Sequence, residues 1–333
     1  MSFEDKYSRI KEIVKTDLDF LEKEIQGLDA NRNPLEKDLA SFLAAPAKRL
    51  RPLLGLLFLR ALFGEINPKQ YDVLLAVELI HNATLIHDDV IDKAEKRREQ
   101  ETLNVKFDNE LAVIAGDYLL SVAMEKVINT NSVEVIKTCT SGLKSTCLGE
   151  INQYFTRHQI TSIEQYIEKS REKTALLFEI SVLGALLLSD ENAQSKHSQL
   201  GDGGLVNPPY FTNQGQALIA PDYENLKNPA KDFAQNFGIA FQIRDDLINV
   251  LSAQNDISSG IYTAPVIFAV EENENILKSE NMIEEIKKTK GIEKTKILMD
   301  NYFNNSVSAI QSFEDNVYKR ALLDLIELLR TSL

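Results

Sequence analysis

The feature that most constrains the fold is the spacing of apolar residues, which recur at intervals of three and four along almost the whole chain. This period matches one face of an α-helix, and strand-like alternation bounded by turn residues is hard to find. The sequence therefore predicts an all-α protein. We expect helices at 3–27, 34–44, 50–63, 68–93, 107–130, 132–155, 162–188, 229–252, 262–271, 280–288, 291–312 and 314–331.

One long segment, residues 189–231, breaks the helical pattern. It holds four of the nine prolines and four of the fourteen glycines of the chain. Helical periodicity resumes directly after Pro229, so we interpret the segment as a surface insertion in a single domain and not as a linker between domains. A loop without a role of its own is the simplest interpretation of this insertion.

Charge and composition exclude several classes of protein. The chain of 333 residues has 37 basic and 50 acidic side chains and a formal net charge of −13, whereas nonspecific nucleic-acid binding needs a basic surplus. The apolar stretch 53–59 is far shorter than a membrane span of about 20 residues. The first residues are charged and lack a signal peptide's apolar core, and the two cysteines cannot form a disulfide framework. We expect a cytoplasmic protein that binds no nucleic acid and has no transmembrane segment.

The most informative stretch, residues 78–92, reads as an apolar helix that ends in three aspartates. Residues four apart in a helix are separated by about 40° around its axis. Asp88 and Asp92 therefore present their carboxylates on one face, with Asp89 beside them. Three carboxylates this close repel one another, and a hard cation removes the repulsion. Mg²⁺ prefers carboxylate oxygens and is commonly completed by water and substrate phosphate oxygens.

A second acidic set, Asp245 and Asp246, lies inside the apolar helix predicted at 229–252. Asp245 and Asn249 share a face at the same four-residue spacing, and Gln242 lies about one turn earlier. Two such helices facing one another would form an acidic site for several divalent ions. For either set alone, a helix-terminal acidic cluster is an equally good explanation. Two copies in apolar settings favour function, because buried unpaired carboxylates are costly.

Basic residues supply the complementary charge. Lys48, Arg49 and Arg51 precede one apolar helix, and Arg97 and Arg98 follow the first acidic set. The arginine side chain binds phosphate oxygens in a bidentate manner, and lysine adds a point charge. Each cluster alone is typical of a solvated surface. Together with carboxylates that bind metal, the clusters predict a diphosphate site.

In their order along the chain, these residues resemble the trans-isoprenyl diphosphate synthase (polyprenyl synthetase) family. The resemblance covers about residues 40–270 apart from the insertion, and the ordered set of motifs is highly specific. The motifs are Ala47–Pro52, His87–Asp92, Arg97-Arg98 with Thr102 and Asn104, Ala115–Tyr118, Gly149–Gln153, Lys173-Thr174 and Phe241–Asp246. The resemblance implies a single-domain bundle of about 10–13 helices with a central cavity, assembled as a homodimer.

The resemblance also implies residue roles. Asp88, Asp92 and Asp245 would bind several Mg²⁺ ions that hold the allylic diphosphate, and Asp89 and Asp246 would act through water. These five aspartates and Lys173 are the residues we expect to be catalytic. The side chains implied to contact isopentenyl diphosphate are Lys48, Arg51, His81 and Arg98. Those implied to contact the allylic diphosphate are Arg97, Lys173, Thr174 and Gln242. Spacings of three and four place His81, Thr84 and Asp88 on one stripe.

The resemblance further implies a reaction in which the allylic diphosphate ionises and the alkene of isopentenyl diphosphate attacks the cation. Product length should depend on the side chains beneath the first acidic set. Ala83 and Thr84 are small at positions where short-chain synthases often have an aromatic residue. We therefore expect a long-chain product of the octaprenyl or solanesyl type, typical of quinone side chains.

The chain departs from the family pattern at several positions. Glu99 replaces a glycine, and Asn249 replaces the last aspartate of the second acidic set, although its amide oxygen can still bind a metal. Residues 249–260 lack the usual lysine, and Ile261 replaces a second diphosphate-binding lysine. We expect weaker binding of the allylic diphosphate as a result.

Other functions are compatible with parts of the pattern. The protein could be a short- or medium-chain synthase that makes farnesyl or geranylgeranyl diphosphate, or a weakly catalytic subunit of a heteromeric synthase. A terpene cyclase would need a second metal triad of Asn, Ser and Glu, which we do not find. A metal-dependent phosphohydrolase using His81, His87 and Asp88 would leave the second acidic set unexplained. A helical scaffold without activity would bind no diphosphate in the presence of Mg²⁺.

Overall fold

The computed structural model describes residues 2–28, 33–98, 100–189, 223–252, 260–279 and 281–333, and the backbone of 210–211 and 217–218. The chain divides into two compact units. We call Lys11–Cys139 with Gly184–Tyr223 the amino-terminal unit, and Met1–Ile10, Thr140–Leu183 and Glu224–Leu333 the carboxy-terminal unit. The all-α prediction is confirmed, and the single domain stays a prediction.

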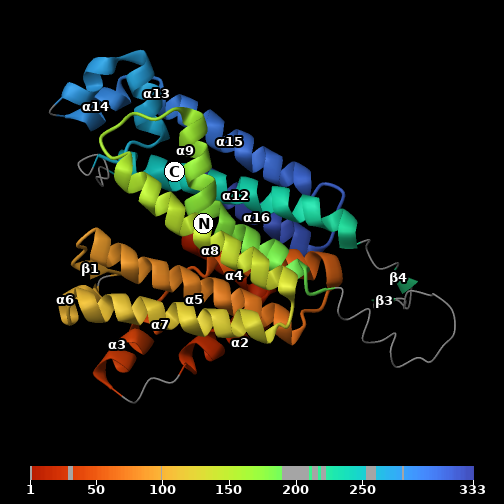
Figure 1. Cartoon of the computed structure of the whole chain (residues 1–333). Coiled ribbons are helices and arrows are strands. Elements are labelled where there is room, and N and C mark those ends of the chain that lie inside the picture. The colour runs from red at the N-terminus through yellow and green to blue at the C-terminus, as the bar shows by residue number, and fades with distance from the viewer. Residues whose placement is uncertain are drawn as a thin grey trace. The chain divides into compact units, whose positions relative to one another are not determined.

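Helices α4 and α5 form the centre of the amino-terminal unit, and α5 and α7 lie side by side (Figure 1). Helices α1 (Phe3–Ile13) and α8 (Val133–Phe155) begin in one unit and end in the other. The remaining elements here are α2 (Lys15–Gln26), α3 (Pro34–Ala44), α4 (Leu50–Phe63), α5 (Pro68–Ile91), β1 (Lys96–Arg97), β2 (Gln100–Glu101), α6 (Leu103–Lys106) and α7 (Asn109–Asn129).

Helix α5, which carries the first acidic set, has clear sequence signals for where it begins. Asn67 and Gln70 form a reciprocal capping box, and Pro68 occupies the first turn, where its missing N–H costs nothing. The amide of Gln70 also donates to the carbonyl of Ala185 (3.1 Å). Helix α5 is apolar nearly all round because neighbouring helices bury it: it packs against α7 and against α4, in which Leu53 and Leu54 are fully buried. This packing holds the carboxyl end of α5 in place.

The carboxy-terminal unit is built around buried aromatic rings. Phe178 and Phe303 each pack edge-on against Phe237, with centroids 5.2 and 6.2 Å away. The elements are α9 (Ile163–Ser170), the π-helical η1 (Arg171–Ala175), α10 (Leu176–Glu179), the π-helical η2 (Ile180–Gly184), α12 (Tyr223–Leu251), α13 (Ala264–Glu272), the 3₁₀ helix η4 (Glu274–Lys278), α14 (Met282–Lys287), α15 (Gly291–Ala309) and α16 (Val317–Thr331).

Three predicted helices need correction. The helix expected at 162–188 consists of α9, η1, α10 and η2, two of which are π-helical. The helix expected at 3–27 is divided at Val14, whose φ of −123° is not helical. Helix α12 begins at Tyr223 and not at Pro229, because a single proline removes one hydrogen bond without ending this helix. Among the described residues, no helix is both long and apolar enough to cross a bilayer.

Most of the predicted insertion lies outside the described residues, namely 190–209, 212–216 and 219–222. Within it, β3 (Tyr210–Phe211) pairs antiparallel with β4 (Ala217–Leu218). Glu99 and residues 253–259, which carry two of the departures noted above, also lie outside the described part of the chain.

Candidate active site

The first acidic set has two outer, accessible carboxylates, Asp88 and Asp92, and one inner, buried carboxylate, Asp89. Helix α5 ends at Ile91, and the backbone N–H of Asp92 donates to the carbonyl of Asp88 (2.8 Å), so the two lie one turn apart. Asp88 is partly buried and Asp92 is exposed. Asp89 is 2% exposed and accepts from Nε of Arg97 (2.7 Å). The buried carboxylate therefore anchors Arg97, whereas Asp88 and Asp92 are accessible to solvent and ligands.

A cluster of basic side chains surrounds His81 on α5. Desolvation and then the charges of Arg51 and Arg98 hold the pKa of His81 well below its usual value of 6.5. An imidazole with a lowered pKa remains neutral at pH 7, so His81 can accept or donate a hydrogen bond without adding charge. The concentrated positive charge around it matches an anionic ligand.

The guanidinium of Arg98, in the same cluster, also favours an anionic ligand. Its backbone has a left-handed φ of 51°, a conformation that is costly for a non-glycine residue and common at functional sites. Burial, together with the charge of Arg49, lowers the pKa of Arg98. Its Nη1 is buried and has no hydrogen-bond partner among the described residues. A phosphate oxygen would satisfy that N–H and neutralise the charge.

Arg49 has a structural role, although the sequence groups it with the other basic residues. Its guanidinium donates to Glu22 (2.8 Å), to Glu78 (2.9 Å) and to the carbonyl of Leu43 (2.6 Å). Two carboxylates and a carbonyl leave Arg49 little capacity to bind a ligand. Lys48 beside it is exposed.

The stripe predicted along α5 is present, and one histidine faces a neighbouring helix. Thr84 donates to the carbonyl of His81 (2.8 Å), and the adjacent Ala83 is fully buried. His87 lies against α7, with its Nε2 3.2 Å from the carbonyl oxygen of Val113. A Cβ at Gly116 would lie 2.2 Å from the same nitrogen, so a glycine is needed for this contact.

The second acidic set, on α12, also has an inner and an outer carboxylate. Asp246 is 4% exposed and accepts from the hydroxyl of Tyr166 (2.6 Å) and the amide of Gln242 (2.9 Å). Burial raises the pKa of Asp246 to about 6, although both hydrogen bonds act in the opposite direction. Burial and the charge of Asp246 hold the pKa of Tyr166 well above 10. Asp246 is thus an internal hydrogen-bond acceptor.

The outer carboxylate, Asp245, is partly buried and is held by its neighbour Arg244. Nη1 of Arg244 lies 3.1 Å from Oδ1 of Asp245. The same guanidinium donates to the carbonyls of Leu329 (2.8 Å) and Ser332 (3.0 Å), which ties the end of α16 to the second acidic set. Arg244 therefore orients Asp245 and fixes the carboxyl end of the chain.

Lys173 and Thr174 lie in the π-helical segment η1, an irregularity that is frequent at functional sites. Lys173 forms an ion pair with Glu150 of α8. The hydroxyl of Thr174 donates to Gln242, whose amide in turn donates to Asp246. Thr174 and Gln242 therefore belong to one hydrogen-bonded network that reaches Asp246, and Lys173 pairs separately with Glu150.

The structure divides the predicted site between the units. The amino-terminal unit carries Lys48, Arg51, His81, Ala83, Thr84, Asp88, Asp89, Asp92, Arg97 and Arg98, and the carboxy-terminal unit carries Lys173, Thr174, Gln242, Asp245 and Asp246.

The donor groups suit a hard divalent cation. Asp88, Asp92 and Asp245 offer carboxylate oxygens, and Asn249, which is partly buried, offers an amide oxygen. No three His, Cys, Asp or Glu side chains form a ready metal-binding group within the described residues. Mg²⁺ commonly keeps several waters and adds substrate phosphate oxygens, so it needs few protein ligands.

Sequence reasoning missed the structural partners of the site. Tyr166 holds Asp246 from 80 positions away, and Arg244 joins Asp245 to the end of α16. Because Tyr166 and Asp246 are so far apart in the sequence, no residue spacing could have predicted their contact. For Arg244, the adjacent Asp245 was a partner visible in the sequence, because a buried cation needs an anion, whereas the carbonyls of Leu329 and Ser332 lie 85 and 88 positions away.

The chain is similar to known proteins over most of its length. The polyprenyl synthetase family model matches residues 32–206 and 210–301. A prenyl transferase of Cyanidium caldarium is 28% identical over 341 residues, which cover 96% of each chain. The mitochondrial solanesyl-diphosphate synthase 1 of Oryza sativa subsp. japonica is 27% identical over 361 residues, which cover 95% of this chain and 77% of that protein.

The solved structures give the same fold. A polyprenyl synthase from Caulobacter crescentus CB15, complexed with calcium and isoprenyl diphosphate, has a TM-score of 0.78 to this structure at 22% identity. The match covers 98% of this chain and 97% of that one. At this level of identity the likeness concerns the fold.

Proposed function

Because the chain belongs to the polyprenyl synthetase family, we propose that it condenses isopentenyl diphosphate with an allylic diphosphate to make a long-chain all-trans polyprenyl diphosphate. The membership confirms the resemblance of the sequence motifs and makes the protein an enzyme of the polyprenyl diphosphate synthase class. The family match over most of the chain is the observation that carries the proposal. The chemistry of the two acidic sets and of the basic cluster supports it.

The metal in this proposal is Mg²⁺, held by Asp88, Asp92 and Asp245. When bound, it supplies positive charge that stabilises the negative charge growing on a departing diphosphate. Asp89 and Asp246 are buried and hydrogen-bonded, so they support the outer carboxylates and act at a distance from the metal. Arg244 orients Asp245 through its 3.1 Å contact.

Isopentenyl diphosphate binds, in this proposal, to the basic cluster of the amino-terminal unit. Lys48, Arg51, Arg98 and His81 hold its diphosphate. The buried Nη1 of Arg98 gains an oxygen acceptor, and the neutral His81 adds a hydrogen bond. The nucleophilic alkene is thereby oriented by its diphosphate end.

The allylic diphosphate binds to Arg97, Lys173, Thr174 and Gln242. Its C–O bond breaks, the electron pair leaves with the diphosphate, and an allylic cation remains. The alkene carbon of isopentenyl diphosphate attacks this cation, a new C–C bond forms, and the released diphosphate takes the proton that is lost. Charged side chains in fixed positions lower the barrier because they stabilise the charge that develops on the leaving group.

We propose a long-chain product of the octaprenyl or solanesyl type, destined for quinone side chains. Ala83 is fully buried on α5, next to the stripe that leads to Asp88, and an alanine there leaves no bulky stop for a growing tail. The solanesyl-diphosphate synthase of rice supports this product class. We also propose that the protein is a cytoplasmic homodimer.

Product analysis tests the function directly. Purified protein, Mg²⁺, labelled isopentenyl diphosphate and a geranyl, farnesyl or geranylgeranyl primer should give long polyprenyl diphosphates, identified by mass spectrometry. Release of phosphate without any prenyl product would favour a phosphohydrolase. Products no longer than geranylgeranyl diphosphate would refute the long-chain proposal, and no product without a second protein would point to a heteromeric synthase.

Ala83→Phe tests the determinant of chain length. A phenylalanine at this buried position should shorten the product, with a loss of stability of about 1–3 kcal/mol from overpacking. Ala123→Phe, in the buried face of α7, is a matched control that overpacks the same unit and should leave the length unchanged. An unchanged product from Ala83→Phe would refute the chain-length role.

A further inference from the structure

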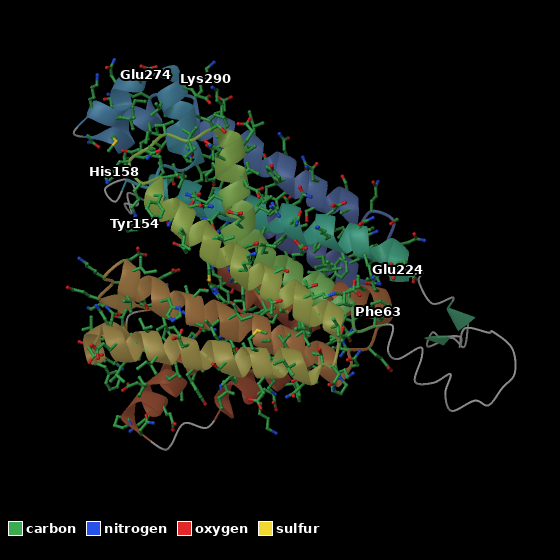
Figure 2. The ribbon with its side chains drawn as sticks, viewed as in Figure 1. Phe63, Tyr154, His158, Glu224, Glu274 and Lys290 are labelled. Atoms are coloured by element: carbon green, nitrogen blue, oxygen red, sulfur yellow. The ribbon has the colours of Figure 1, made fainter. Side chains whose placement is uncertain are left out.

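The guanidinium of Arg244 joins three helices of the carboxy-terminal unit. Arg244 lies near the carboxyl end of α12, the helix whose start is marked by Glu224 in Figure 2. Its side chain is 7% exposed, so its N–H groups need partners inside the protein. The guanidinium contacts Asp245, the end of α16 and the ring of Phe3 in α1. Arg244 is therefore the point at which α1 and α16 reach the second acidic set.

Neutral oxygens at the end of α16 accept hydrogen bonds from two of the three guanidinium nitrogens of Arg244. Nε donates to the carbonyl of Leu329 (2.8 Å), and Nη2 donates to the carbonyl (3.0 Å) and to the hydroxyl (2.8 Å) of Ser332. The hydroxyl of Ser332 donates in turn to the carbonyl of Leu329 (3.3 Å). Because its one proton is used there, this hydroxyl acts as an acceptor toward Arg244.

Asp245 contacts Arg244 through the remaining nitrogen. Nη1 lies 3.1 Å from Oδ1 of Asp245. A guanidinium can donate two parallel N–H bonds to one carboxylate, and that bidentate pair is stronger than a single bond. With Nε and Nη2 bonded to α16, the bidentate pair does not form. The carboxylate of Asp245, which is 41% exposed, is thereby left accessible to a metal ion.

Phe3 covers the same guanidinium from α1. Its ring centroid lies 6.0 Å from Cζ of Arg244, and the ring stacks on Tyr7 with centroids 5.7 Å apart and planes at 11°. Tyr7 is 3% exposed, so the stacked pair is anchored in the interior. The attraction between a cation and an aromatic face adds to the hydrogen bonds. Helices α1 and α16 therefore both hold the guanidinium in place.

We propose that the end of α16, with Ser332 as a positioning residue, sets the metal affinity of Asp245 by limiting how many donors of Arg244 reach that carboxylate. The inference rests on the proposed function, in which Asp245 binds Mg²⁺. While Ser332 holds Nη2, Asp245 keeps its charge for the metal. When Ser332 releases Nη2, that group turns to Asp245 and competes with the metal. Substitution of Ser332 therefore changes metal affinity although Ser332 is not a metal ligand.

Binding of Mn²⁺ to the purified protein, measured by electron paramagnetic resonance of the free ion, tests the inference without turnover. Mn²⁺ occupies the octahedral oxygen sites that also suit Mg²⁺. Ser332→Ala removes one acceptor and should raise the Kd about threefold, whereas Ser332→Asp holds Nη2 more strongly and should lower the Kd about threefold. Ser332→Asn retains an acceptor oxygen and should keep the Kd of the wild type. A merely structural role of Ser332 would weaken binding in both of the first two variants.

Two comparisons show whether the effect passes through Arg244 and Asp245. Thr331→Asp is the matched control, because it adds the same charge at an exposed neighbour whose hydroxyl donates to the carbonyl of Glu327, and its Kd should equal that of the wild type. Both Ser332 effects should disappear in the Asp245→Asn background, where no carboxylate competes for the guanidinium. Unchanged Kd values in the Ser332 variants, shifts in the same direction, or effects that persist without the carboxylate would overturn the inference.

Product analysis separates this inference from the function on which it rests. An active synthase whose Mn²⁺ affinity does not depend on Ser332 would refute the role of α16 and keep the synthase. A wild type without prenyl product, whose Kd still shifts in opposite directions in Ser332→Ala and Ser332→Asp, would refute the synthase and keep the role of α16. A wild type that binds no Mn²⁺ would refute the inference together with the metal role of Asp245.

Discussion

The two acidic sets share a sequence pattern and differ in how the inner carboxylate is held. In the first set, buried Asp89 is bonded to the cation Arg97 at 2.7 Å. In the second, buried Asp246 receives hydrogen bonds from two neutral donors, Tyr166 and Gln242. One inner aspartate therefore has a full opposite charge in contact, and the other has only dipoles.

This difference has an energetic consequence. A cation left in a partly buried place without its carboxylate costs free energy, whereas a neutral donor that loses a charged acceptor can turn to another one. The raised pKa of Asp246, about 6, reflects a burial penalty that neutral donors do not offset. The outer carboxylates, by contrast, are alike in both sets because both are accessible.

The largest expected effect tests the property that the two sets share, an accessible outer carboxylate assigned to the metal. Asp88→Asn and Asp245→Asn should each lower kcat by about 10³, because each removes charge that holds the metal and stabilises the leaving diphosphate. Asp232→Asn, an exposed residue on the same helix as Asp245, is the matched control and should keep wild-type kcat. Wild-type kcat in either active-site variant would remove that carboxylate from the metal assignment.

The next effect tests the difference between the two sets, which is the charged or neutral partner of the inner carboxylate. Asp89→Asn should lower the free energy of unfolding by about 2 kcal/mol, because Arg97 loses its buried partner. Asp246→Asn should change it by less than about 1 kcal/mol, since an amide still accepts a hydrogen bond and no longer carries a buried charge. Urea denaturation of both variants measures the difference, and equal losses would contradict the comparison.

The pH dependence of stability gives a smaller effect. The folded pKa of His81 lies below the unfolded value of 6.5, so below pH 6.5 the unfolded chain binds a proton that the folded protein does not. His81 therefore lowers the free energy of unfolding as the pH decreases from 6.5 toward its folded pKa, by at most about 1.4 kcal/mol per pH unit. Asp246, with its pKa raised to about 6, acts in the opposite direction below pH 6, so the variant and the wild type are compared directly. His81→Gln should flatten this slope in denaturation series between pH 5 and 7. An unchanged slope would show that His81 is not the responsible group.

The smallest effect isolates one neutral donor of the second set. Tyr166→Phe should cost about 1 kcal/mol of stability, because it removes the hydrogen bond to Asp246. Tyr302→Phe in α15 is a matched control in the same unit. A double-mutant cycle with Asp246→Asn measures the coupling, and additive losses would mean that the Tyr166 to Asp246 bond contributes little.

Much of this molecule was predictable from local sequence. Apolar periodicity predicted most helices, and the capping residues Asn67 and Ser162 begin α5 and α9 as their sequence signals indicate. The break at Val14 and the start of α12 before Pro229 were not predicted, because packing overrides the weak preferences at helix ends.

The candidate site was predictable only in part. Four-residue spacing placed Asp88 with Asp92, and Asp245 with Asn249, on one face of a helix, because helix geometry alone decides which residues share a face. The sequence grouped Arg49 with the ligand-binding cations, but Glu22 and Glu78 bind its guanidinium. Neither glutamate is near Arg49 in the sequence, so no local signal could reveal the contact.

The sequence by itself determined the helices, the two aspartate pairs and the family, because each depends on residue types at short spacings. Only the tertiary structure decided which carboxylates are inner and which donors hold them. These properties depend on distances between residues that folding brings together from separate helices. The free energy of a charged side chain depends on its burial and on the groups around it, and the amino-acid sequence alone does not show these surroundings.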